Sequence, residues 1–411
     1  MWLYRFLIGG YFKLIALASY FRYDAKKWVF GRINWRNLYL KLNPQNQITI
    51  WIHCSSLGEF EQGRPLIEMI RNNHPDEFIW LSFFSPSGYE IRKSYDKVNV
   101  VSYFPSDLQK DVTNFLSIVN PKLVIFVKYD FWFETIYQLN RKTVPFIFIS
   151  MHLTKNSFLV KSWMSPLINE LKKGKHFFLQ TSESTAILES LNIHNFSISG
   201  DTRLDRVLQI ADNPDVPQKI KDFCFGNKIL ICGSVWESDL DIILQTWNNL
   251  NQTDWKFVIA PHLPNENMLS HIESLFNKNT IRYSDLNKNI DSHILIIDNI
   301  GMLSSLYSVG TLCYVGGGFG KNIHNILEPA AHLKPVCFGH KHHKFPEAAE
   351  FIRAEFGFEI HDSKTLLNII QKAESKEWLS LKSMEISKFL DKHSGATRKV
   401  YQKLIDLKLL N

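Results

Sequence analysis

Short apolar runs alternate along most of the chain with longer segments in which apolar residues recur every three or four positions. In the first half the runs predict strands at 48–53, 78–84, 99–103, 123–127, 145–150 and 176–180. Helical periodicity lies between them, for example at 64–71 and 107–119. The pattern restarts in the second half, with strands predicted at 228–232, 257–260, 294–297, 312–315 and 336–338. Strands that alternate with helices at this spacing predict parallel α/β units.

The segment 211–219, ADNPDVPQK, separates the two halves and carries two prolines among polar residues, which is typical of a linker. We therefore expect two Rossmann-like parallel-sheet domains that face a cleft. The expected division is a helix at 1–27, an N-terminal domain at 28–210, the linker at 211–219, a C-terminal domain at 220–385 and a C-terminal helix at 386–411 that packs back on the N-terminal domain. Ligands of open α/β sheets bind beyond the carboxyl ends of the strands, so chemistry is sought in the loops there.

The first 22 residues predict an amphipathic helix. At about 100° per residue, Trp2, Arg5, Lys13 and Tyr20 fall within one sector and the remaining circumference is largely Leu, Ile and Phe. We expect this helix to be an interfacial membrane anchor, held mainly by apolar burial. Two alternatives stay open: an ordinary buried helix, and a cleaved signal peptide, which Lys13 disfavours.

Composition narrows the class of protein. The chain has 411 residues, of which 45% are hydrophobic and 13% aromatic, so it can bury large cores and is not intrinsically disordered. No apolar run is long enough for a polytopic membrane protein. The five cysteines are scattered in apolar surroundings and predict buried thiols in a reducing compartment. The net charge of +7 suits an anionic ligand or membrane surface, while nucleic acid is not expected because no long basic block or recognised motif occurs.

A first candidate for chemistry is Glu59, in the stretch His-Cys-Ser-Ser-Leu-Gly-Glu that follows a predicted strand and opens a helix. A carboxylate at this position can act as a general base, and the helix dipole favours its ionised form. The alternative is that Glu59 only caps the helix as a first-turn acid.

The second half offers two further candidates. Ser234 lies where a strand ends in Gly-Ser and enters a helix, a junction that presents backbone N–H groups and a hydroxyl to a phosphate. Residues 316–320 contain four glycines, which allow close backbone approach to a ligand. Asn325 and Glu328 follow one helical turn apart and suit ribose hydroxyls or a base edge. The alternative there is a structural turn with a capped helix.

The stretch 340–344, His-Lys-His-His-Lys, invites comparison with a metal site. Consecutive loop residues seldom share one metal, and no matching carboxylate or cysteine spacing accompanies them. We expect a basic, anion-facing loop and no metal.

Taken in order, several of these stretches resemble the 3-deoxy-D-manno-octulosonic acid (Kdo) transferases of lipopolysaccharide synthesis. The stretches that carry the resemblance are His53 with 56–59 and 64–65, Ser-Pro-Ser-Gly at 85–88, Asp-Phe-Trp at 130–132, Gln-Thr-Ser-Glu at 180–183, Ser-Gly-Asp-Thr at 199–202, Asp-Asn-Ile-Gly at 298–301, and 325–330 with 334–335 and 338–339. They cover nearly the whole chain.

The resemblance implies a GT-B fold and a metal-independent, inverting glycosyltransferase without a cofactor. The donor would be CMP-Kdo and the acceptor a lipid A precursor, lipid IVA. Glu59 falls on the family's catalytic base, which deprotonates the attacking hydroxyl of the acceptor. A lipid acceptor implies residence at the cytoplasmic face of the inner membrane, with residues 1–22 on the membrane surface.

The resemblance also implies which residues hold each substrate. Donor-binding residues would be Ser234, His262, Ile300, Gly301, Gly318, Asn325 and Glu328. Acceptor-binding residues would be Ser56, Gly58, Arg64 and Asp130.

The chain departs from the family's pattern at three positions. Ala-Pro-His-Leu at 260–263 stands where the family has Pro-Arg-His, so either His262 takes the role of the phosphate-binding arginine or Ser234 and backbone N–H groups suffice. Asp130 replaces a glutamate, and His152 stands where an arginine is expected. Two alternatives to a Kdo transferase stay open: a GT-B transferase or epimerase acting on another nucleotide sugar, and a non-catalytic membrane-bound nucleotide-sugar binder.

Overall fold

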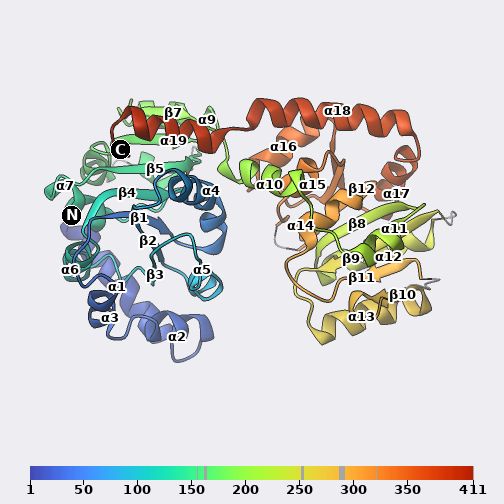
Figure 1. Ribbon diagram of the computed structural model, residues 1–411, viewed down its shortest axis with the longest axis horizontal. Helices are drawn as coiled ribbons and strands as arrows, with labels where there is room; N and C mark the ends of the chain where they lie inside the picture. The colour runs from blue at the N-terminus through green and yellow to red at the C-terminus, as the bar shows by residue number, and fades with distance from the viewer. Residues whose placement is uncertain (155, 162–163, 251–253, 287–291, 321, 411) are drawn as a thin grey trace. The chain divides into compact units, whose positions relative to one another are not determined.

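The computed structural model describes residues 1–154, 156–161, 164–250, 254–286, 292–320 and 322–410. Its contacts divide the chain into two compact units, Met1–Asp205 with Ser394–Asn411, and Arg206–His393. The first division lies a few residues before the expected boundary at 210, and the return to the first unit begins at 394, where 386 was expected. Figure 1 shows the elements of each unit.

The first unit is built on a seven-stranded, fully parallel sheet in the order β3-β2-β1-β4-β5-β6-β7. Its strands are β1 Thr49–Cys54, β2 Phe78–Phe83, β3 Val100–Tyr103, β4 Pro121–Val127, β5 Phe146–Met151, β6 His176–Leu179 and β7 Phe196–Ile198. Its helices are α1 Trp2–Ala18, α2 Tyr23–Phe30, α3 Trp35–Leu42, α4 Leu57–Asn73, α5 Pro86–Arg92, α6 Gln109–Val119, α7 Phe133–Arg141, α8 Ser165–Leu171, α9 Glu183–Ser190 and α19 Ala396–Asp406. The helix α10, Thr202–Asp212, runs across the division into the second unit.

The second unit repeats this architecture with the parallel order β10-β11-β9-β8-β12-β13-β14. Its strands are β8 Lys228–Val235, β9 Trp255–Pro261, β10 Thr280–Arg282, β11 Ile294–Ile296, β12 Leu312–Val315, β13 Val336–Gly339 and β14 Gly357–Ile360. Its helices are α11 Gln218–Cys224, α12 Glu237–Asn248, α13 Glu266–Phe276, α14 Leu303–Leu306, α15 Leu327–Ala331, α16 Pro346–Arg353, α17 Ser363–Lys372 and α18 Lys376–His393. The expected α/β class with two Rossmann-like parallel sheets is therefore confirmed.

The central strands are buried on both faces, which is why they read as unbroken apolar runs in the sequence. In the first sheet the side chains that alternate along each strand form two different layers. Trp51, Phe126 and Phe148 lie in an aromatic core on one face, whereas Ile50 and Ile125 lie in a mostly aliphatic core on the other. Residues of α19 join the aliphatic core, so the C-terminal helix, red in Figure 1, packs against the first unit.

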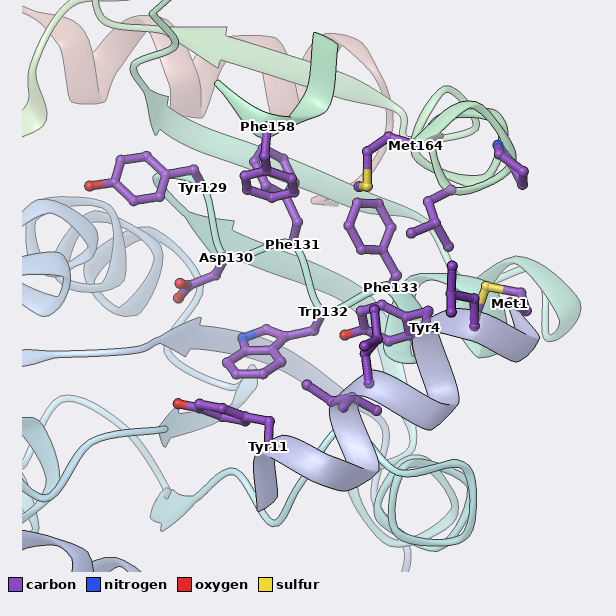
Figure 2. Close-up of a pocket in the computed structure, with 15 residues that line it drawn as sticks. Met1, Tyr4, Tyr11, Tyr129, Asp130, Phe131, Trp132, Phe133, Phe158 and Met164 are labelled. Carbon is purple, nitrogen blue, oxygen red and sulfur yellow. The ribbon is translucent and has the colours of Figure 1, made fainter. Parts of the chain in front are cut away.

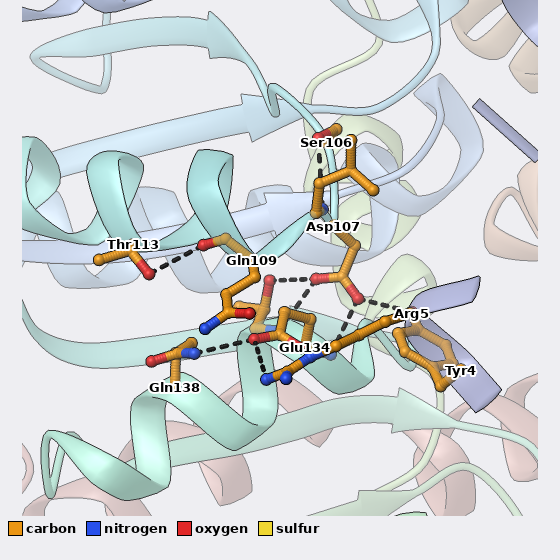
Figure 3. Close-up of polar contacts among 10 residues, drawn as sticks. Tyr4, Arg5, Ser106, Asp107, Gln109, Thr113, Glu134 and Gln138 are labelled. Carbon is orange, nitrogen blue, oxygen red and sulfur yellow. Dashed lines mark hydrogen bonds and ion pairs between the residues drawn. The ribbon is translucent and has the colours of Figure 1, made fainter. Parts of the chain in front are cut away.

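The N-terminal helix α1 is docked on the first unit by buried polar contacts, shown in Figure 3. The Tyr4 hydroxyl donates to Asp107 Oδ2 at 2.5 Å. Arg5 forms an ion pair with Glu134 at 2.7 Å, and both Asp107 and Glu134 are fully buried. The sequence pattern grouped Arg5 with Trp2 on one polar sector, but in the structure Arg5 faces the domain and Trp2 is 78% exposed.

The outer surface of α1 is strongly apolar. Large apolar side chains exposed on it are Trp2, Leu3, Phe6, Leu7, Tyr11, Leu14 and Leu17. Among the described helices, none combines the length and the apolar character needed to cross a bilayer. All five cysteines are buried and unbridged, as their surroundings in the sequence predicted.

Candidate active site

Near the centre of each sheet the strand order reverses beside the first strand of that sheet, and ligands of open α/β sheets bind at such points. In the first sheet the reversal lies between β1 and β4. In the second it lies between β8 and β12. The carboxyl ends of these four strands and the segments directly after them contain Glu59, Asp130, Ser234 and the glycine-rich stretch 316–320, so most predicted site residues gather at the two switch points.

Glu59 lies in the first turn of α4, directly beyond β1. Its Oε2 accepts a hydrogen bond from the backbone N–H of Ser56 at 2.9 Å, so it does cap the helix. The side chain is nevertheless 9% exposed, which is unusual for a capping acid. Because the capping bond uses Oε2, the second carboxylate oxygen can serve a different purpose, and capping and base chemistry are compatible.

Asp130 lies beyond β4, where the charge of Glu59 acts on it. Its Oδ2 accepts from the backbone N–H of Ser55 at 2.9 Å. Burial, followed by the charge of Glu59, raises the pKa of Asp130 well above its usual range, and burial raises the pKa of Glu59 as well. Two buried carboxyl groups this close retain a proton at higher pH than either would alone.

Near Asp130, three side chains are joined by hydrogen bonds: Trp132, His53 and Ser82. Trp132 Nε1 donates to His53 Nε2 at 2.9 Å, and His53 Nδ1 lies 2.8 Å from Ser82 Oγ. Since Nε2 accepts, Nδ1 carries the proton of the neutral ring and donates to Ser82. Burial lowers the pKa of His53 to about 3, so the 3.7 Å approach of its Nε2 to Asp130 is not an ion pair near neutral pH.

Lys128 provides positive charge beside the carboxyl pair. It lies between β4 and Asp130 with a φ of 63°. Its charge lowers the pKa of Glu59 and Asp201 and also that of His152. Lys128 therefore stands in the electrostatic environment of all three groups, and it favours an ionised Glu59.

Several polar groups of the first unit are buried without a hydrogen-bond partner among the described residues. They are both amide atoms of Gln62, Nδ1 of His152, Nε2 of Gln180 and the hydroxyl of Thr181. Gln62 lies on α4 one turn after Glu59, while the others follow β5 and β6 at the same edge of the sheet. Buried polar atoms without a partner are costly, so this edge offers donors and acceptors to water or to a polar ligand.

The other three predicted acceptor residues are Ser56, Gly58 and Arg64, and each has different surroundings. Ser56 is the N-cap of α4, and a Cβ added to Gly58 would meet nothing within 4 Å. The glycine at 58 therefore has no packing reason among the described residues. Arg64 is paired along its own helix, with Glu68 at 2.7 Å and Glu61 at 3.9 Å.

In the second unit, Asp239 organises the switch point. This buried residue of α12 accepts from the N–H of Gly317 at 2.9 Å, from the N–H of Trp236 at 2.8 Å and from the hydroxyl of Tyr314 at 2.8 Å. It thereby joins the end of β12, the glycine-rich stretch and the start of α12. Ser234, near these hydrogen bonds at the end of β8, has a φ of 53°.

Packing accounts for the predicted donor residue Gly318. A Cβ at Gly318 would lie 2.6 Å from the backbone of Gly339. Lys341 holds the same stretch through its Nζ, which donates to the carbonyls of Phe319 and Gly320 at 3.1 and 2.8 Å. The glycines of this loop thus allow backbone to pack on backbone.

His262 lies in a stack of three rings. Its ring centroid is 4.5 Å from Trp236 and 4.3 Å from His324, with near-parallel planes. Trp236 Nε1 donates to His324 Nε2 at 2.7 Å. Burial lowers the pKa of both histidines, that of His324 to about 4, so both rings are largely neutral at pH 7.

The remaining donor residues divide into two groups. Asn325 Nδ2 donates to Glu328 Oε1 at 3.0 Å, so the two side chains are in contact, but Asn325 precedes α15, which begins at Leu327, and the expected shared helix face is not formed. Ile300 and Gly301 lie in the turn between β11 and α14, where Ile300 is 83% exposed and Gly301 has a φ of 110°. The sequence analysis assigned no role to Asp239, Trp236, His324 or Lys128. For Asp239 the one available signal was an acidic residue in the first turn of a helix that follows a strand.

A carboxylate lies beside the predicted basic loop at 340–344. His342 Nε2 contacts Glu359 Oε2 at 2.5 Å, and His361 contacts the same carboxylate at 3.2 Å. No group of three or more His, Cys, Asp or Glu side chains in the described part of the chain is arranged to hold a metal ion.

Known proteins with similar sequences include several Kdo transferases. Residues 30–206 match the family model described as 3-deoxy-D-manno-octulosonic-acid transferase (kdotransferase). A bifunctional glycosyltransferase/methyltransferase of Fusobacterium nucleatum is 28% identical over 80% of this chain, and the match spans only 53% of that longer protein. Proteins named 3-deoxy-D-manno-octulosonic acid transferase are 26% identical in Aquifex aeolicus and 24% identical in Haemophilus influenzae. These matches cover 77% and 87% of this chain, and 84% and 86% of the relatives.

Solved structures support the fold. The UDP-GlcNAc 2-epimerase of Neisseria meningitidis aligns with a TM-score of 0.60 and 14% identity, covering 88% of this chain and all of the other. A glycosyltransferase of Rickettsia africae aligns with a TM-score of 0.58 and 13% identity, covering 87% of this chain and 97% of the other. The expected GT-B class of fold is thus supported by both, and at these identities the likeness concerns the fold alone.

Proposed function

We propose that this chain is a Kdo transferase, because residues 30–206 match that family's model, and that it transfers Kdo from CMP-Kdo to a lipid A precursor. The single observation that carries the proposal is the buried carboxyl pair of Glu59 and Asp130 at the β1–β4 switch point. A carboxylate there is buried and has a raised pKa, which suits a general base better than a surface acid would.

In the proposed reaction, Glu59 takes the proton of an acceptor hydroxyl as its oxygen attacks the anomeric carbon of Kdo. The new C–O bond forms while the bond between that carbon and the CMP phosphate oxygen breaks, and CMP leaves with the electron pair. A single in-line displacement of this kind inverts the anomeric centre. Asp130 stays close enough to Glu59 to influence when it gains its proton, and Lys128 favours the ionised base.

We assign the CMP moiety to the β8–β12 switch point of the second unit. The Asn325–Glu328 pair offers an amide and a carboxylate to ribose hydroxyls or a base edge. His262 stands where the family has an arginine, but its stacked ring, whose pKa is lowered, is largely neutral. It therefore contributes an N–H donor to a phosphate instead of a fixed positive charge, and the loop around Ser234 supplies further N–H groups.

We assign the membrane contact to the apolar outer surface of α1, whose exposed side chains include Phe6, Leu14 and Leu17. A helix that is docked by polar contacts on one side and apolar on the other suits peripheral attachment to a bilayer. The cytoplasmic face of the inner membrane is the location that this acceptor requires.

The test is incubation of the full chain with CMP-Kdo and a lipid A precursor, followed by mass analysis of the lipid. Transfer adds one or more Kdo residues and releases CMP. Glu59→Gln should lower the rate by about 10²–10⁴-fold while CMP binding persists. Glu61→Gln, two residues further along α4 and partly exposed beside Arg92, is the matched control and should keep its activity.

The alternatives predict different products. An epimerase would convert a nucleotide sugar without modifying the lipid, and a non-catalytic binder would release no CMP. Normal turnover by Glu59→Gln would contradict the assignment of the base.

A further inference from the structure

A large apolar groove lies on the first unit, next to the carboxyl pair. It has a volume of about 780 Å³, within the range typical of ligand sites. One wall is α1, and the others are the segment 129–133 and the residues from Phe158 to Leu167 that are described. Asp130 is the one charged side chain among its lining residues, so the groove begins at the site and continues as an apolar surface.

The groove has a polar end and an apolar end. Figure 2 shows the Asp130 carboxyl and the hydroxyls of Tyr11 and Tyr129 on one side, while Met1 and Met164 lie toward the other. An occupant therefore needs a polar group near Asp130 and an apolar body that extends away from it.

We propose that this groove binds an acyl chain of the lipid acceptor, with the sugar to which that chain is attached held at Asp130 and Glu59. The proposal rests on the proposed function and deepens it, because it assigns how the lipid part of the acceptor is held. A peptide would bring backbone N–H and C=O groups that require partners when buried, and the apolar walls provide few. A hydrocarbon chain requires none.

Two further observations support an acyl chain. Leu3, Leu7 and Tyr11 of α1 line the groove and are also exposed, so the groove is continuous with the apolar surface that we assign to the membrane. A chain can therefore enter from a lipid phase without crossing water. The Tyr4–Asp107 and Arg5–Glu134 contacts hold α1 in place (Figure 3), so this wall is a fixed part of the domain.

Two leucines of α1 allow the groove to be tested separately from the membrane-facing surface. Leu7 and Leu14 lie seven residues apart on α1, so they project from nearly the same side of the helix. They are 53% and 65% exposed, yet only Leu7 lines the groove. Leu7→Asp should weaken acyl binding, and Leu14→Asp is its control.

The first measurement is binding of the fluorescent fatty acid cis-parinaric acid to the full chain below its micellar concentration. Leu7→Asp should weaken binding at least about tenfold, and Leu14→Asp should change it little. Phe158→Ser, from the opposite wall and 42% exposed, should weaken binding as Leu7→Asp does. Equal loss in Leu7→Asp and Leu14→Asp, or no loss in Leu7→Asp, would overturn the proposal.

The second measurement compares Kdo transfer to an acylated lipid A precursor in detergent micelles with transfer to its deacylated, water-soluble counterpart. Leu7→Asp should raise the KM for the acylated acceptor at least about tenfold and leave that for the deacylated acceptor unchanged. Suppose that the wild-type chain transfers no Kdo, and that Leu7→Asp but not Leu14→Asp weakens binding of parinaric acid. The acyl site then stands and the proposed function falls. If the wild type is a dimer that Leu7→Asp dissociates, the groove is a self-interface and the acyl site falls.

Discussion

At the scale of single residues, Glu59 caps a helix, and this role is compatible with the base that we propose. It caps α4 through Ser56, as first-turn acids commonly do, and it is also buried next to a second carboxyl group. The cap fixes the orientation of the carboxylate, so under the proposed mechanism it would accept a proton from a fixed direction.

The charge of Lys128 leads to a prediction on pH dependence. This charge lowers the pKa of Glu59, against the burial that raises it. Lys128→Met should raise the pKa of Glu59, and since the base must be ionised, the acidic limb of the kcat/KM profile should move to higher pH. Lys128→Arg should restore the profile. Lys122→Met, at the amino end of β4 where Lys122 pairs with Glu77, should leave it unchanged. A profile that does not move in Lys128→Met would separate Lys128 from the base.

Two glycines lead to opposite predictions. At Gly58, in the first turn of α4, a Cβ meets open space, so Gly58→Ala should keep or slightly raise stability, by up to about 0.5–1 kcal/mol. At Gly318 a Cβ meets the backbone of Gly339, so Gly318→Ala should destabilise the fold by about 1–3 kcal/mol. Denaturant unfolding distinguishes them. If Gly58→Ala lowers activity without loss of stability, the missing side chain makes room for a ligand.

At the scale of elements, α1 is held on the first unit by hydrogen bonds to buried side chains. Tyr4→Phe removes one of the four hydrogen bonds that Asp107 accepts, the others coming from the N–H of Glu134 and from the N–H and hydroxyl of Thr135. Loss of a partner for a buried carboxyl costs about 1–3 kcal/mol. Hydrogen exchange should therefore rise in residues 2–18 of this variant. Unchanged protection there would show that Tyr4 does not hold the helix.

The strands that the sequence pattern missed share one physical property. β7, β10 and β14 lie at edges of the two sheets and are short or only partly buried. An edge strand has one hydrogen-bonded neighbour and needs less apolar surface than a central strand, so it leaves no unbroken apolar run in the sequence. The predicted central strands were confirmed within two residues or so at their ends, except β8 at its carboxyl end, because burial on both faces demands such runs.

At the scale of the whole molecule, the outer surface of α1 predicts reversible attachment to membranes. We expect the full chain to sediment with anionic vesicles and Leu14→Asp to lower the bound fraction about tenfold, since burying one leucine contributes about 1.5–3 kcal/mol. Leu381→Asp on α18, 48% exposed and in the other unit, is the control. Equal binding by Leu14→Asp and the wild type would move the membrane contact away from α1.

The sequence by itself determined the α/β class, the positions of the central strands and the place of Glu59 at a strand–helix junction. These features depend on burial along one segment or on neighbours within a helical turn, and such relations are written in the local pattern. The Asn325–Glu328 bond belongs to the same group, because its partners are three residues apart.

Only the tertiary structure decided which groups face Glu59. Asp130 lies about seventy positions further along the chain, and the pairing of β1 with β4 brings their loops together. The same holds for the charge of Lys128, the ring stack around His262 and the groove between α1 and 129–133. Burial and proximity of this kind depend on which strands become neighbours in the sheet, and no local periodicity records that choice.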